Sequence, residues 1–174
     1  MSYTVFSNFR IDSEERLQRL KDSYNSFSNS NITNWAINIR GPLKYKAADF
    51  LRTNIKSNLN LFFFESNEGW FHDSRKMIKF LKNDYILFWI EDQINIGGKN
   101  YLNECIESMR KNSIDYLVYS WFHNGDNLKS ILSIKHKEDN NIIYTNYEKN
   151  NHNQRIKLAK KNSLTISSYV ISAT

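Results

Sequence analysis

The chain has 174 residues, of which 40% are hydrophobic and 14% aromatic, so it can bury a substantial core and fold as one domain. This composition excludes a chain that is disordered throughout. A formal net charge of +6 favours an anionic partner such as a nucleotide diphosphate, a nucleic acid or an anionic membrane, although lysines that only solvate the surface would give the same charge.

The first part of the chain alternates between strand and helix patterns. A buried strand is expected at residues 3–7, and an Asp12-x-x-Glu15 capping box then predicts a helix with apolar residues at helical spacing. Residues 35–39 alternate as in a strand, and Gly41-Pro42 ends that strand and begins a second helix.

The same alternation continues to residue 122. Residues 61–64 form a short apolar run that suits a strand buried on both faces, and Met77, Ile78 and Leu81 mark the inner side of the next helix. Residues 85–90 are the most hydrophobic strand of the chain, and we expect them in the interior of the sheet.

A fourth helix follows Gly97-Gly98, and residues 116–121 form the next strand. The apolar face of this helix consists of Tyr101, Leu102, Cys105, Ile106 and Met109. Regular alternation of strands and helices predicts an α/β fold, a Rossmann-like three-layer sandwich with a central, mostly parallel sheet flanked by helices.

The remainder of the chain has a different pattern, and we treat residues 1–174 as a single domain. The expected segments are a helix or strand at 128–136, a polar turn at 138–141, a strand at 142–147, a charged stretch at 148–162 and a last strand from 164 to 174.

Cysteine content and the absence of apolar segments indicate the compartment. The single Cys105 excludes an internal disulfide, fits a reducing environment and is expected in the core rather than as a nucleophile. The first ten residues do not resemble a signal peptide, and no apolar run approaches the ~20 residues of a membrane span. The sequence therefore predicts a cytoplasmic protein without a transmembrane segment, and leaves peripheral membrane contact open.

Polar residues follow each predicted strand, where an open parallel sheet binds its ligands. These stretches are residues 7–10, 40–41, 65–69, 91–93 and 120–125. Among them Glu91 and Asp92 directly follow the most apolar strand, and such a carboxylate pair must lie at the edge of the sheet because burying it unpaired would be unfavourable. Two carboxylates suit Mg²⁺ or Mn²⁺ shared with a diphosphate, while a helix cap or a salt bridge to a lysine is the alternative.

Residues 67–93 resemble family 2-type glycosyltransferases of the GT-A fold. Asn67-Glu68-Gly69 matches their Asn-x-Gly stretch, residues 83–88 match the strand that follows, and Ile90-Glu91-Asp92 lies where these enzymes have an Asp-x-Asp motif. The last acid of this motif is present as Asp92, and Ile90 replaces the first. The resemblance covers about residues 3–122, and it implies a nucleotide-sugar-binding core at 1–122 and a partial acceptor-side region at 123–174.

The resemblance implies transfer of a sugar from a nucleotide-diphospho-sugar to a glycan or other acceptor, with Mn²⁺ or Mg²⁺ assisting departure of the diphosphate. Asp92 would bind the metal ion, and Glu91 would contact the metal ion or the ribose. Arg40 lies where the family often has an acidic base-binding residue, which is a departure. The implied donor-binding residues are Ser7, Asn8, Arg10, Arg40, Asn67, Gly69 and Arg75.

The catalytic base is harder to place. Glu138-Asp139 is the only later acidic pair, and it comes too early for the family's base. His123 follows a predicted strand at the same edge and titrates near neutrality, so it is a candidate base, with simple packing as the alternative. His72 adjoins Asp73 at a predicted helix start, which fits an acid–base pair or, more simply, a helix cap by Asp73.

Two other functions remain open. An incomplete acidic motif and a missing base would fit a non-catalytic relative that binds a sugar nucleotide or carbohydrate. A basic nucleic-acid-binding protein would need the aromatic residues at 62–64, Trp89 and Trp121 exposed for stacking. These residues lie in apolar strands, so we expect them in the core and expect no nucleic-acid partner.

Overall fold

A computed structural model describes residues 3–27, 32–97, 100–118, 137–144 and 169–172. The elements are β1 (Tyr3–Arg10), α1 (Glu14–Phe27), β2 (Ile32–Arg40), α2 (Lys44–Asn54), β3 (Asn58–Phe62), α3 (Trp70–Met77), the 3-10 turn η1 (Ile78–Phe80), β4 (Tyr85–Phe88), α4 (Tyr101–Lys111), β5 (Tyr116–Val118), β6 (Lys137–Glu138), β7 (Ile143–Tyr144) and β8 (Tyr169–Ser172). His123, Trp121 and the segments predicted at 128–136 and 148–162 lie outside the described residues.

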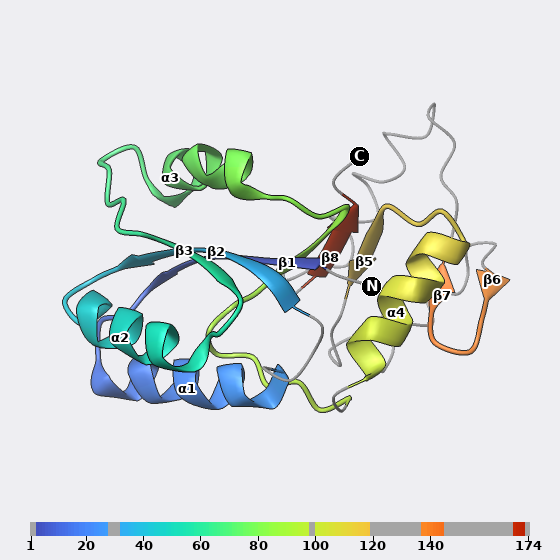
Figure 1. Ribbon diagram of the computed structural model, residues 1–174, viewed down its shortest axis with the longest axis horizontal. Helices are drawn as coiled ribbons and strands as arrows, with labels where there is room; N and C mark the ends of the chain where they lie inside the picture. Colours follow the sequence, from blue (N-terminus) through green and yellow to red (C-terminus); the bar gives the residue numbers. More distant parts are fainter. Residues whose placement is uncertain (1–2, 28–31, 98–99, 119–136, 145–168, 173–174) are drawn as a thin grey trace, which may run out of the picture.

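The central sheet has six strands in the order β3-β2-β1-β4-β8-β5 (Figure 1). The first four are parallel, and β8 pairs antiparallel with both β4 and β5. The predicted α/β fold with a mostly parallel sheet is therefore confirmed. β4 lies between β1 and β8, so the predicted interior position of residues 85–90 is also confirmed, although the strand ends at Phe88.

Helices cover both faces of the sheet, with α1 and α2 on one side and α3 on the other (Figure 1). The hydrophobic core lies on the α1–α2 side, where alternate residues of the strands point, and residues of α4 join the same cluster. Trp89 is 2% exposed and stacks edge-on with Phe9, Phe27 and Trp35. Its predicted core position is confirmed, and it is closed to stacking on a nucleic acid.

The sheet face under α3 carries a row of asparagines in addition to phenylalanines. Asn8, Asn34 and Asn38 are on this face, and the last two are buried. Asn38 Nδ2 donates to Asn8 Oδ1 at 3.0 Å and to the Phe64 carbonyl at 2.9 Å, and its Oδ1 accepts from the Phe64 amide at 2.7 Å. One side chain thus joins β1, β2 and the segment after β3, with every polar atom of its amide used.

Two predicted boundaries near the start of the chain are wrong. β1 runs on to Arg10, so residues 8–10 belong to the strand. α1 begins at Glu14, and its capping residue is Ser13, whose Oγ accepts from the Arg16 amide at 3.2 Å. Asp12 does not cap the helix because its carboxylate forms ion pairs with arginines instead.

Three burial predictions are also wrong. β3 is an edge strand at 58–62 rather than a strand buried on both faces at 61–64, because only β2 pairs with it. Ile78 is 57% exposed because the α-helix ends at Met77 and a 3-10 turn follows. Tyr101 is 38% exposed and donates its hydroxyl hydrogen to the Asn141 carbonyl, while the other four residues of that helix face are buried.

The polar turn predicted at 138–141 joins β6 to β7 in a separate two-stranded hairpin. β8, at residues 169–172, lies within the last predicted strand, and the part of that prediction at 164–168 falls outside the described residues. No helix among the described residues is long and apolar enough to cross a membrane.

Candidate functional site

The candidate site is the edge of the sheet at which β1, β2, β3 and β4 all end. β1 and β4 are parallel neighbours with Phe6 opposite Phe88, so the residues that follow each strand meet at one edge. Residues 7–10 and Glu91-Asp92 were expected to end at one edge and to face one open cleft. The shared edge is confirmed, whereas the side chains of Ser7 and Glu91 are buried and face no cleft. We call this edge the strand-end rim.

Two of the predicted donor-binding residues hold the rim together. Ser7 is fully buried, and its Oγ donates to the Trp89 carbonyl at 2.6 Å, which fixes the chain as it leaves β4. Asn8 Nδ2 donates to the Trp70 carbonyl and to Ser74 Oγ, both at 2.8 Å, and so attaches the start of α3 to β1. Both side chains position neighbouring segments.

The loop between β3 and α3 contains the predicted residues Asn67 and Gly69, which precede α3, while Arg75 lies exposed on the helix. Gly69 has φ +86° and ψ 177°, a conformation that glycine adopts readily, and α3 begins directly after it. Asp73 does not cap α3, because the helix begins three residues earlier. His72 pairs with Glu68, Nδ1 to Oε2 at 2.6 Å, and not with Asp73.

Asp73 instead anchors this loop. Its carboxylate is fully buried and accepts from the Ser66 amide at 3.0 Å, with the Lys76 ammonium at 3.4 Å. Burial raises the pKa of Asp73, but the hydrogen bonds from Ser66 and the nearby Lys76 outweigh it, and the pKa lies below the ordinary 3.8. The residue therefore stays ionised and holds the Asn67–Gly69 segment against α3.

The two acids after β4 have different surroundings. Glu91 is buried, and its Oε1 accepts from Arg16 of α1 at 2.6 Å. Burial raises its pKa above the ordinary 4.5, and Arg16 offsets only part of the rise. Asp92 is exposed.

A divalent metal ion was predicted on this acidic pair. No cluster of three His, Cys, Asp or Glu side chains in the described part of the chain could hold an ion. Glu91 does not fit as a ligand because its carboxylate is committed to Arg16. Asp92 fits as a single protein ligand, which is sufficient for an ion that is otherwise bound by phosphate and water.

A series of ion pairs, which we call the rim chain, runs along the strand ends. Its members alternate in charge: Lys44, Glu65, Arg10, Asp12, Arg16 and Glu91. The successive N–O distances are 3.7, 2.7, 2.8, 3.7 and 2.6 Å. This series of ion pairs was not predicted from the sequence. The Asp12–Arg16 spacing could have indicated one link, but the partners of Glu65 and Glu91 are distant in sequence.

Arg40 differs from the other basic residues at the rim. It is opposite Arg10 in the register of β1 and β2. Its Nε is buried and has no hydrogen-bond partner, and no carboxylate of the described residues lies within 4.0 Å of its guanidinium.

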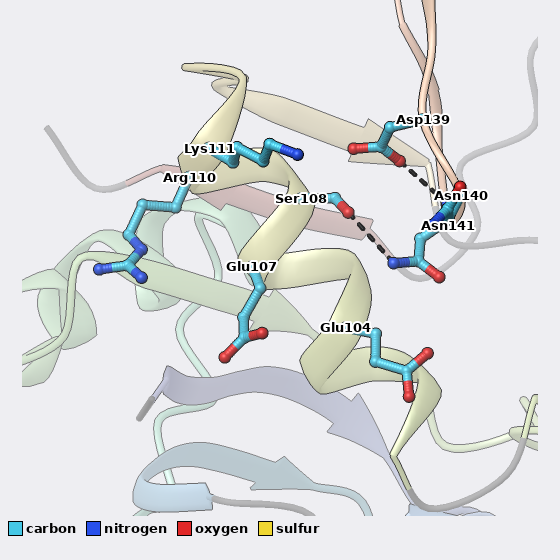
Figure 2. Close-up of a pocket in the computed structure, with 8 residues that line it drawn as sticks. All are labelled: Glu104, Glu107, Ser108, Arg110, Lys111, Asp139, Asn140 and Asn141. Carbon is cyan, nitrogen blue, oxygen red and sulfur yellow. Dashed lines mark hydrogen bonds between the residues drawn. The ribbon is translucent and has the colours of Figure 1, made fainter.

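A separate hollow of about 430 Å³ lies between α4 and the β6–β7 hairpin (Figure 2). Figure 2 shows Ser108 and Asp139 turned toward Asn141, and both accept hydrogen bonds from it, at 3.3 and 2.9 Å. Asp139 also accepts from the Ile142 amide, so it stabilises the hairpin turn. None of the residues that line this hollow belongs to the strand-end rim, and the hydrogen bond from Asn141 to Ser108 attaches the hairpin to α4.

No protein-family model and no curated protein sequence matches the chain. Among solved structures, the crystal structure of S. aureus TarS 1–349, a glycosyltransferase, is similar with a TM-score of 0.50 and 16% sequence identity. The match covers 68% of this chain and 35% of that one, so this chain spans about a third of the solved structure. The similarity shows that the fold is glycosyltransferase-like, a Rossmann-like GT-A fold with four parallel central strands.

Proposed function

We propose that this chain binds a nucleotide-diphospho-sugar at the strand-end rim and transfers the sugar to an acceptor. The main support is the position of Asp92. It is an exposed carboxylate directly beyond β4, at the place of the retained acid of the family's motif, in a chain with a glycosyltransferase-like fold. Arg10, Arg40 and Lys44 at the other strand ends supply the positive charge that a diphosphate requires.

Asp92 is the residue that would hold Mg²⁺ or Mn²⁺ in this proposal. When bound, the ion neutralises the charge that develops on the departing diphosphate. Glu91 would act indirectly, because its pairing with Arg16 fixes the backbone from which Asp92 projects. His123 remains the proposed base and lies outside the described residues.

A non-catalytic sugar-nucleotide-binding relative is the second candidate. The replacement of the first acid of the motif by Ile90 and the burial of Glu91 favour it, because together they leave Asp92 as the one carboxylate of the motif that is exposed. Such a protein would bind the same donor in the same place without consuming it.

A thermal-shift panel of nucleoside diphosphates and their sugars, with and without Mn²⁺, tests donor binding, because a ligand raises the melting temperature as its concentration exceeds Kd. We expect one sugar nucleotide to stabilise the protein more with Mn²⁺. Asp92→Asn should weaken this binding at least about tenfold by titration calorimetry, which corresponds to ~1.4 kcal/mol, without lowering the melting temperature of the free protein.

The matched control is Asp84→Asn. Asp84 is also exposed but precedes β4, at the opposite end of the strand, so this variant should bind like the wild type. Equal binding by the Asp92 variant, or no stabilisation by any sugar nucleotide, would exclude the proposal. Release of nucleoside diphosphate from the bound donor on addition of acceptors separates a transferase from a binding protein.

A further inference from the structure

We propose that Arg10 and Arg40 form a phosphate-binding subsite at the β1–β2 end of the strand-end rim, and that this subsite binds phosphate without a divalent cation. Its assignment to a phosphate of the donor rests on the proposed function. The binding of phosphate itself does not.

The first support is the register of the two strands. Arg10 and Arg40 are directly opposite each other in a parallel pair, as are Asn8 and Asn38 two residues earlier. Opposite residues of parallel strands point to the same face, and the 3.0 Å hydrogen bond between the two asparagines shows this for the preceding pair. The side chains of Arg10 and Arg40 therefore leave the two neighbouring strands on the same face, the one covered by α3.

The second support is the unequal pairing of these two cations. Arg10 contacts Asp12 at 2.8 Å and Glu65 at 2.7 Å, and both carboxylates raise its pKa. Arg40 has no carboxylate partner among the described residues, and its buried Nε lacks any acceptor. Buried polar atoms nearly always have partners, so an unpaired guanidinium nitrogen on the strand next to that of a second arginine points to a position that an anion can occupy.

The third support is that the carboxylates around Arg10 are held only loosely. Glu65 and Asp12 are 39% and 44% exposed. Ion pairs with this much exposure contribute little to stability, so both carboxylates can turn into water at small cost. A phosphate group could then accept two parallel hydrogen bonds from a guanidinium. A carboxylate that is shared among several cations does not have the best geometry for such a pair of bonds.

Lys44 strengthens the same end of the rim. Its ammonium is 3.7 Å from Glu65, so it would face the phosphate once Glu65 turns away. At the β4 end, Arg16 is committed to buried Glu91, and Asp92 is the exposed charge. The rim thus has a basic subsite at β1–β2 and an acidic one after β4, and each would hold one phosphate of a diphosphate, the second through a cation.

Titration calorimetry with pyrophosphate in excess EDTA tests the subsite on the full chain. We expect wild-type protein to bind pyrophosphate, and Arg10→Gln and Arg40→Gln each to weaken binding at least tenfold. Arg40→Lys keeps the charge but loses the planar, forked guanidinium, so its affinity for pyrophosphate should lie between that of the Gln variants and that of the wild type. Arg52→Gln is the matched control, because Arg52 is an exposed arginine of α2 whose ion-pair partner among the described residues is Asp49, and it should bind within twofold of the wild type.

Circular dichroism melting of each variant checks that the fold persists, and the subsite is judged on those variants that melt like the wild type. Equal weakening by Arg52→Gln, or pyrophosphate binding only when Mn²⁺ is present, would overturn the proposal. Pyrophosphate binding that depends on both arginines in a protein that binds no sugar nucleotide would retain the subsite and exclude the donor. Loss of donor binding in Asp92→Asn, together with unchanged pyrophosphate binding in Arg40→Gln, would retain the donor site and exclude the phosphate subsite.

Discussion

Arg16 of α1 and Glu91 beyond β4 form an ion pair of 2.6 Å in which the Glu91 side chain is only 6% exposed. The arginine is 41% exposed, so the pair is buried at its acidic end and solvated at its basic end. It connects the first helix to the segment that carries Asp92. Burial raises the pKa of Glu91 even though the arginine is bound, so the pair does not fully compensate for burying the carboxylate.

The pH dependence of stability should reveal Glu91. Because its pKa is above 4.5 in the folded protein, the folded state retains this proton over a pH range in which the unfolded chain has released it. The contribution of Glu91 therefore becomes less favourable as pH rises from 4.5 through the raised pKa. Glu91→Gln keeps an oxygen for Arg16 and cannot ionise, so its melting temperature should rise relative to the wild type between pH 4.5 and 7.5.

Glu15→Gln serves as the control, because Glu15 forms a similar pair with Arg19 while 74% exposed. Its melting curve should follow that of the wild type across this pH range. A Glu91 variant that loses stability relative to the wild type as pH rises would show that the pair is net stabilising, and the prediction would be wrong.

Two glycines should respond differently to alanine. Gly41 has φ +92°, and a Cβ there would be 2.6 Å from the Ile11 carbonyl oxygen, which already accepts from the Leu43 amide. Gly69 has φ +86° with open space around it. Gly69→Ala should therefore cost only backbone strain, about 1–3 kcal/mol, and Gly41→Ala should cost more because the clash adds to the strain. Urea unfolding measures both, and equal losses would contradict the predicted clash.

Cys105 should be inert in the folded protein. It is 2% exposed, and burial raises the pKa of its thiol to about 11. Roughly one thiol in a thousand would then be ionised at pH 8, and only the thiolate reacts. A disulfide reagent that absorbs on reaction should label the native protein over hours and the urea-unfolded protein within minutes. Rapid labelling without urea would show that α4 opens readily.

Alternation of apolar residues predicted the fold because it reflects contacts between neighbouring segments. β4 was placed correctly in the interior from its continuous apolar run alone. The insertion of β8 between β4 and β5 was not predicted, because residues 169–172 pair with residues 51 to 87 positions earlier, and nothing in a local pattern specifies such partners.

The location of the strand-end rim was predicted from the sequence, but the roles of its residues were predicted only in part. Glu91 and Asp92 were found because they follow a predicted strand. The burial of Glu91 depends on its ion pair with Arg16, which lies 75 residues earlier. Ser7 and Asn8 were expected to face the donor, whereas their side chains bond to Trp89 and to the start of α3. Composition cannot distinguish a polar side chain that binds a ligand from one that satisfies the backbone of another segment.

Asp73 should stabilise the loop that precedes α3. Removing its carboxylate with Asp73→Ala leaves the Ser66 amide without its acceptor, which should cost about 1–3 kcal/mol. For a chain of this size this corresponds to a fall in melting temperature of roughly 2–4 °C per kcal/mol. Asp49→Ala, in which an exposed carboxylate paired with Arg52 is lost, should change the melting temperature little.

The stability of the Asp73 variant at acidic pH provides a second measurement. The pKa of Asp73 lies below its ordinary 3.8 in the folded protein, so the stability that it contributes is present above pH 3.8 and is lost as pH falls through the lowered pKa. The difference between the wild type and Asp73→Ala should therefore be constant from pH 5 to 7 and shrink below 3.8. If Asp73 also holds Asn67 and Gly69 in place for the donor, the variant should bind sugar nucleotide more weakly at 20 °C, where it is still folded. A variant that melts earlier yet binds normally would restrict Asp73 to a structural role in the loop.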